Sequence, residues 1–186
     1  NDQPKHVTLL TRPALCRAPS IVPPRTLLRG IQRRMIAHIV QSVLVHGIVQ
    51  PGVVALLGAL GVNRIAVRRP PRVAIVVTGS EVRRPAARSL PEWAVRDSHA
   101  AFLVAALQEF RIKPLLVSYA RDRAPDIRRQ IARALDRADL VIVTGGVSVG
   151  ERDLVRPVLS SLNVRPVFWG VAQAPGKPLY FGTRGN

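Results

Sequence analysis

The chain has 186 residues, of which 47% are hydrophobic and only 4% aromatic, so it is long enough for one well-buried aliphatic core and unlike an aromatic-rich β-sandwich. Its single cysteine, Cys16, excludes an internal disulfide, and no cysteine and histidine set has zinc spacing. The formal charge is +17, but the basic residues are mostly arginines scattered along the whole sequence, which favours compositional bias and a field that attracts anionic ligands over a nucleic-acid partner.

The N-terminal sequence predicts neither a signal peptide nor a membrane span. Residues 1–5 are polar and no hydrophobic core region follows them. The apolar segment 35–49 contains His38, Gln41, Ser42 and His46, which make it too short and too polar to cross a bilayer. We therefore expect a cytoplasmic protein without a membrane partner.

Residues 1–50 are expected to form an irregular or degenerate N-terminal segment, because five prolines interrupt any period within the first thirty positions. Residues 31–50 fit both a helical stripe and short strands, and the sequence does not choose between them. The segment 51–71 predicts a short helix that begins at Pro51 and ends at Gly61, followed by a basic, proline-marked linker.

From residue 72 the pattern becomes regular. Apolar runs predict strands over 72–79, 114–120 and 139–146, with two further short strands over 165–170 and 177–182. Helices are predicted over 97–110, from near Pro125, and over 154–162. This alternation predicts a three-layer α/β domain over 72–186 with a largely parallel sheet.

Each predicted helix has an expected inner face. For the first helix these residues are Phe102, Leu103, Ala106, Leu107 and Phe110, for the second Ile127, Ile131, Ala134, Leu135 and Ala138, and for the third Leu154, Val155, Val158, Leu159 and Leu162. Asp97 or Ser98 is placed to cap the first helix, and Asp153 to cap the third.

Ligands of such domains bind outside the carboxyl ends of the strands, and the loops there are rich in glycine and acids. They read TGSE (78–81), ARD (120–122), TGGVSVGERD (144–153) and QAPGKP (173–178). Glycines allow a close backbone approach to an anion. Neither common nucleotide motif is present: Gly170 lies one residue too far from Gly176-Lys177 for a P-loop, and Gly145-Gly146 are adjacent, unlike the dinucleotide fingerprint.

Four motifs together, TGSE (78–81), RDS (96–98), TGGVSVGERD (144–153) and PGKP (175–178), resemble in order and spacing the central catalytic domain of the molybdopterin molybdenumtransferases, including gephyrin-type proteins. The resemblance covers about residues 51–184. It implies a molybdopterin-binding α/β fold, insertion of molybdate into adenylylated molybdopterin with release of AMP, a divalent metal such as Mg²⁺, and a homodimer.

The resemblance also implies roles for individual residues. Glu81 and Asp153 would be catalytic and would hold the metal, and Lys177 would neutralise phosphate or molybdate charge. The substrate-binding residues would be Thr78, Gly79, Ser80, Asp97, Ser98, Asp122, Gly145, Gly146, Val147, Ser148, Gly150, Pro175 and Gly176. Each acid has a simpler alternative, since Asp153 and Asp97 are also expected to cap helices.

The sequence departs from the family pattern at four positions. Ser80 stands where the family commonly has aspartate, His99 where it has asparagine, Arg123 where it has a second acid, and Ala174 where it has a lysine. The family's N-terminal regions leave only a degenerate trace around 31–50, and its further glycine-proline loop and C-terminal β-domain have no counterpart. We therefore expect a fragment, a truncated gene product or a diverged single-domain relative. Three alternatives to the transferase stay open: an adenylyltransferase, whose loop typically reads TGGTG, an inactive molybdopterin-binding or scaffold module, and a nucleic-acid binder.

Overall fold

The computed structural model describes residues 7–11, 49, 51–59, 61–65, 69–146, 153–173 and 177–185. The chain divides into two compact units, one made of Asn1–Leu15 with Pro70–Asn186 and the other of Cys16–Arg69. None of the helices in these described ranges is long and apolar enough to cross a membrane.

The first unit is an α/β domain, as predicted. Its strands are β1 (Val7–Thr11), β2 (Val73–Thr78), β3 (Val82–Arg83), β4 (Val95–Arg96), β5 (Leu116–Ala120), β6 (Leu140–Thr144), β7 (Val164–Trp169) and β8 (Leu179–Arg184). Its helices are α3 (His99–Glu109), α4 (Ala124–Arg137) and α5 (Val155–Ser161). All the strands and helices predicted after residue 72 are therefore present.

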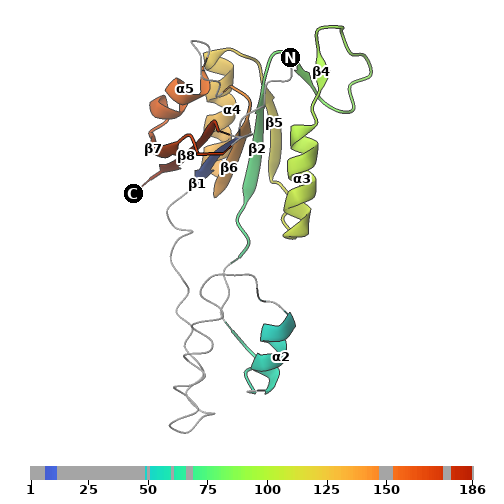
Figure 1. The fold of residues 1–186 in the computed structure, drawn as a ribbon, viewed down its shortest axis with the longest axis vertical. Coiled ribbons are helices and arrows are strands. Elements are labelled where there is room, and N and C mark those ends of the chain that lie inside the picture. The colour runs from blue at the N-terminus through green and yellow to red at the C-terminus, as the bar shows by residue number, and fades with distance from the viewer. Residues whose placement is uncertain are drawn as a thin grey trace. The chain divides into compact units, whose positions relative to one another are not determined.

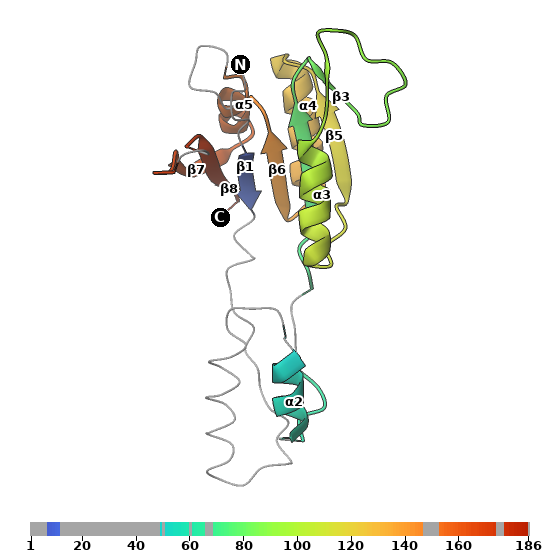
Figure 2. The same ribbon diagram turned by 45° about the vertical axis from the view of Figure 1, so that its right-hand side comes forward.

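Six of these strands form one sheet in the order β5-β2-β6-β1-β8-β7, while β3 and β4 form a separate parallel pair. β5, β2 and β6 run parallel, β1 is antiparallel to β6 and parallel to β8, and β7 is antiparallel to β8. Figure 2 shows the opposite arrows of β6 and β1 clearly. β7 consequently runs in the same direction as β6.

Helices cover both faces of the sheet (Figure 1), with α3 on one side and α4 and α5 on the other. β2 explains the layering, because successive side chains of a strand point to opposite faces. Ala74 and Val76 belong to the cluster under α4 and α5, whereas Ile75 and Val77 belong to the cluster under α3. All six residues of β2 are buried, as a central strand of a covered sheet requires.

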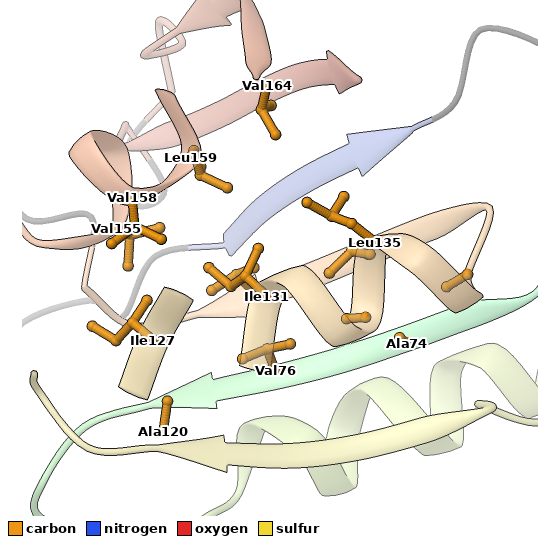
Figure 3. Packing of buried hydrophobic residues seen from close by; sticks show 14 of the residues in the cluster. Ala74, Val76, Ala120, Ile127, Ile131, Leu135, Val155, Val158, Leu159 and Val164 are labelled. Carbon is orange, nitrogen blue, oxygen red and sulfur yellow. The ribbon is translucent and has the colours of Figure 1, made fainter. Parts of the chain in front are cut away.

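The larger cluster confirms the inner faces predicted for α4 and α5. Ile127 and Ile131 of α4 and Leu159 of α5 are fully buried, and Figure 3 shows them in one cluster between the two helices and the sheet. The outward face of α4 carries arginines at 128, 129, 133 and 137, so the charge pattern along this helix separates the two faces unambiguously.

The predicted inner face of α3 is wrong at two positions. Phe102 and Phe110 are 70% and 57% exposed, whereas Ala100, Leu103, Val104 and Leu107 pack against the sheet. Most of the sequence of α3 is apolar, so its hydrophobic periodicity did not distinguish the buried stripe from its neighbours.

Residues 7–11 differ from the sequence prediction, which placed them in an irregular segment. They form β1, in which Val7 pairs with Thr144 of β6 and with Leu179 of β8. Five residues between proline-rich flanks give little strand signal alone. The pairing depends on partners more than a hundred residues away, which the local pattern does not encode.

The second unit contains α2 (Pro51–Ala59). Its C-terminal end confirms the predicted stop at Gly61, whose φ is +68°. The amide of Gly61 donates to the carbonyl of Gly58, and that of Val62 donates to the carbonyl of Leu57 at 2.8 Å. This pair of bonds satisfies carbonyl groups that the end of a helix leaves without partners.

Candidate functional site

The strand ends that flank the loops singled out in the sequence lie along one edge of the main sheet. The carboxyl ends of β5 and β2 meet where Ala120 pairs with Thr78, and Val77 pairs with Thr144 at the end of β6. Next to β6, Val7 of β1 pairs with Thr144 and also with Leu179. Leu179 is the first residue of β8, which runs antiparallel to β6, so the amino end of β8 lies at this same edge. Each predicted loop therefore begins or ends at this edge, which is the upper end of the sheet in Figure 2.

Two neighbouring loops are joined by reciprocal hydrogen bonds between Ser80 and Asp122. The amide of Ser80 donates to Oδ2 of Asp122 at 2.8 Å, and the amide of Asp122 donates to Oγ of Ser80 at 3.0 Å. The amide of Gly79 also donates to the carbonyl of Ala120. The loops after β2 and β5 thus form one structure, in which Asp122 has a structural role in addition to its expected contact with substrate.

The first glycines of the 144–153 loop lie against Thr78. A Cβ atom on Gly145, whose φ is +87°, would lie 2.5 Å from the carbonyl oxygen of Thr78. On Gly146 (φ +69°) it would lie 2.5 Å from Cγ2 of Val155 and 3.0 Å from Oγ1 of Thr78. The hydroxyl of Thr78 donates to the carbonyl of Thr144, which fixes the start of this loop. Only glycine fits both positions without strain.

Asp153 is buried, with only 3% of its side chain exposed. Its Oδ1 accepts hydrogen bonds from the amides of Val155 and Arg156 at 3.1 Å, and its Oδ2 pairs with Nε of Arg156. Both carboxylate oxygens are therefore engaged in capping α5 and in holding Arg156, which is the simpler alternative that the sequence offered.

Arg156 connects this capping residue with β7. Its guanidinium carbon lies 4.2 Å from the ring centroid of Trp169, the last residue of β7. Trp169 pairs in register with Tyr180 of β8. Burial raises the pKa of Tyr180, and the charge of Arg156 acts in the opposite direction.

Asp97 is also buried, and each of its oxygens has a partner. Oδ1 accepts from the amides of His99 and Ala100 at the start of α3, and Oδ2 accepts the hydroxyl of Tyr119 at 2.9 Å. Burial and the bond to Asp97 raise the pKa of Tyr119 to about 12, since both favour the neutral phenol. Asp97 therefore provides the predicted cap, whereas Ser98 makes no side-chain cap bond.

Glu81 and Lys177 have more open surroundings. No hydrogen bond or ion pair to the carboxylate of Glu81 comes from the described part of the chain, although its main-chain carbonyl accepts from Val95. Lys177 is exposed and lies two residues before β8, where its carbonyl accepts from the amide of Val171 at 2.9 Å. The main chain of Lys177 therefore lies near the amino end of β8, at the same edge of the sheet as Gly145.

Comparison with known proteins identifies the domain. A family model for a probable molybdopterin binding domain matches residues 74–186, more than half of the chain. The chain belongs to the molybdopterin-binding domain family. This confirms the resemblance stated from the four motifs.

Similar curated proteins support the assignment to the molybdopterin-binding domain family. A molybdopterin molybdenumtransferase from Nostoc sp. is 35% identical over 130 residues, which are 70% of this chain and 30% of the relative. One from Staphylococcus epidermidis is 33% identical over 69% of this chain and 30% of its own length. Gephyrin from Dictyostelium discoideum is 30% identical over 70% of this chain and 20% of its own. The chain spans less than a third of these relatives.

Among solved structures, a molybdopterin biosynthesis protein from Pyrococcus horikosii matches with a TM-score of 0.55 and 27% identity. The match covers 71% of this chain and 34% of that protein. This match is in keeping with the α/β fold.

The described residues do not by themselves fit the metal that the resemblance implies. Mg²⁺ requires several oxygen ligands in near-octahedral geometry. The ranges that the structure describes contain no group of three or more acidic, histidine or cysteine side chains that could hold a metal. Both oxygens of Asp153 already have partners, and Glu81 alone is not a site.

Five predicted substrate-binding residues lie outside the described ranges, namely Val147, Ser148, Gly150, Pro175 and Gly176. Other contacts of the molybdopterin-binding domain were missed by sequence reasoning. These contacts are the bond from Thr78 to Thr144, the bond from Tyr119 to Asp97 and the stacking of Arg156 on Trp169. They arise from strand register and helix packing. The only local signal was that the two tryptophans are among few aromatic residues.

Proposed function

We propose that this chain is the molybdopterin-binding part of a transferase of molybdenum-cofactor biosynthesis, which inserts molybdate into adenylylated molybdopterin and releases AMP. The observation that carries this proposal is the shared edge of the sheet, where the TGSE loop, the glycine-rich loop and Lys177 meet the ends of β2, β6 and β8. Membership of the molybdopterin-binding family supplies the class of ligand.

The residues at this edge suit an anionic pterin. Gly145 and Gly146 adopt positive φ angles, a conformation in which successive loop amides can turn toward a phosphate. The exposed ammonium of Lys177 would offset the charge of phosphate or molybdate. Glu81, whose carboxylate bonds to no described residue, is the acid best placed to orient water or an oxyanion. Magnesium, if required, would need ligands in addition to those described.

Calorimetry with molybdopterin tests the binding half of the proposal. The wild-type chain should bind, and Lys177→Ala should weaken binding about tenfold because one charge-assisted contact is lost. Lys113→Ala is the matched control, because Lys113 is also exposed but precedes β5, at the opposite edge of the sheet. Equal affinity of both variants would remove Lys177 from the site, and a wild-type chain that does not bind molybdopterin would refute the proposal.

A second candidate is a module that binds molybdopterin without turnover. The contacts of Asp153 favour it, since a carboxylate that caps a helix and pairs with Arg156 has less capacity left to bind a metal or a substrate. Incubation with adenylylated molybdopterin, molybdate and magnesium separates the two functions. Release of AMP above the level with Glu81→Gln supports the transferase, whereas binding without AMP release supports the module.

A further inference from the structure

The segment between β3 and β4, residues 84–94, projects from the main sheet beside the start of α3 (Figure 1 and Figure 2). Its two ends are joined by the pairing of β3 with β4. Within it, Nη1 of Arg96 donates to the carbonyls of Pro85 and Ala87, each at 2.8 Å. These bonds restrain the segment, so a surface on it would lose little freedom when a partner binds.

Large apolar side chains are exposed on this segment and at the start of β4. Leu90 is 40% exposed, Trp93 62% and Val95 43%. A single exposed apolar residue is ordinary, but three so close together on a restrained loop indicate an interaction site. The guanidinium carbon of Arg83 lies 4.7 Å from the ring centroid of Trp93. Tryptophan and arginine are both enriched at the positions that contribute most to protein–protein binding.

Two arginines lie side by side at the base of the segment. Arg83 of β3 pairs in register with Arg96 of β4, so the two side chains share a face of this small parallel pair. Arg84 and Arg88 add positive charge, and Glu92 is the single acid of residues 84–94. Like charges in paired positions repel each other, and no carboxylate from the described part of the chain pairs with either Arg83 or Arg96. An anion from another molecule would remove this repulsion.

The guanidiniums of this arginine pair are each anchored through one nitrogen. Nη1 of Arg83 donates to the carbonyls of Ser80 and Val82 at 2.8 and 3.0 Å, and Nη1 of Arg96 holds the two carbonyls given above. Nε and Nη2 of both side chains make no hydrogen bond to a described residue. Nε and Nη2 form the edge of a guanidinium that binds a carboxylate through two parallel hydrogen bonds.

We propose that the β3–β4 surface, made of Leu90, Trp93, Val95 and the pair of Arg83 and Arg96, binds an acidic segment of another protein. Carboxylates of the partner would neutralise the arginine pair, and an apolar side chain beside them would pack on Trp93. A second copy of this chain is a poor occupant, because it carries the same excess of arginine. A free oxyanion would use the arginines but not the exposed indole. The inference does not rest on the proposed function, since its ligand is not a pterin.

The test selects peptides that bind the whole folded chain from a random library displayed on phage. The enriched sequences should contain aspartate or glutamate beside an aromatic or aliphatic residue. The synthetic form of the most enriched peptide then serves as the probe in fluorescence anisotropy. Trp93→Ala should weaken its binding about tenfold, as the loss of a central contact residue does. A library that yields no enrichment, or enrichment without acids, would overturn the proposal.

Trp169→Ala is the matched control, because Trp169 is also exposed and stacked by an arginine but lies on β7 of the main sheet. Its affinity for the peptide should stay within about twofold of wild type. Leu90→Asp leaves the indole in place and adds a charge of the partner's sign, so it should also weaken binding about tenfold. Wild-type affinity in either Trp93→Ala or Leu90→Asp, or equal weakening by Trp169→Ala, would overturn the assignment.

Phosphatidylserine vesicles and a DNA duplex, used at the same ionic strength, test other anionic partners. The positive charge of the chain should give some binding to both, which Trp93→Ala should leave unchanged. If Trp93→Ala weakens vesicle or DNA binding as much as it weakens peptide binding, the β3–β4 surface is not specific for an acidic protein and the proposal fails.

Discussion

Gly145 is the residue at which backbone geometry is most constrained. Its φ of +87° is unfavourable for any side chain, and a Cβ would lie 2.5 Å from the carbonyl oxygen of Thr78. Gly145→Ala should therefore lower the free energy of unfolding by about 2–4 kcal/mol, measured by urea denaturation. Gly185→Ala is the control, because Gly185 has a φ of +101° but open space around it, and it should cost only about 1–2 kcal/mol. Equal costs would contradict the close approach to Thr78.

At Asp153 a pair of substitutions separates capping from charge. Asp153→Ala leaves two amides at the start of α5 and the guanidinium of Arg156 without their acceptor, so unfolding should become easier by about 2–3 kcal/mol. Asp153→Asn keeps a capping oxygen and should cost about 1 kcal/mol, measured by the same denaturation. A larger loss with asparagine than with alanine would show that capping is not the main contribution.

The junction of α3 and β5 predicts a dependence of stability on alkaline pH. The pKa of Tyr119 is raised to about 12 in the folded protein, above its ordinary value of 10.0. The folded state therefore holds this proton more tightly, and the stability it contributes is present below pH 10 and lost as the pH rises from 10 towards 12.

Tyr119→Phe tests this dependence. At pH 8 the variant should be less stable by about 1–2 kcal/mol, because the buried carboxylate of Asp97 loses a donor. The difference from wild type should shrink between pH 10 and 12, followed by urea denaturation at each pH. Tyr180→Phe is a useful comparison, since burial raises the pKa of Tyr180 without the bond to a carboxylate that Tyr119 makes. A difference that stays constant across this range would contradict the role of Tyr119.

Elements with an unambiguous hydrophobic pattern were predictable from the sequence. Arginines mark the outside of α4, and β2 is apolar on both faces, so their burial followed directly. α3 is apolar on most sides, and the sequence therefore misplaced Phe102 and Phe110. The loops of the site were predictable because strand ends gather at one edge, whereas the bond from Tyr119 to Asp97 and the stacking of Arg156 on Trp169 follow from tertiary packing alone.

For the whole molecule the formal charge of +17 predicts a strong effect of salt on ligand binding. A positive field raises the local concentration of an anionic ligand, and its range falls from about 10 Å at 0.1 M to 3 Å at 1 M ionic strength. Affinity for molybdopterin should therefore fall about tenfold between these concentrations, measured by calorimetry. A neutral pterin without the phosphate should bind with little change, and an equal fall for both ligands would argue against an electrostatic origin.

The position of β1 between β6 and β8 has a consequence for how the gene can be divided. Val7 of β1 pairs with both Thr144 and Leu179, so β1 belongs to the main sheet. Residues 16–69, which form the second unit, therefore stand in the sequence between β1 and β2 of that sheet. Expression from residue 72 onward would leave β6 and β8 with exposed edges, which promote aggregation. A short flexible linker in place of residues 16–69 would retain all six strands, and is the better design for a minimal soluble version.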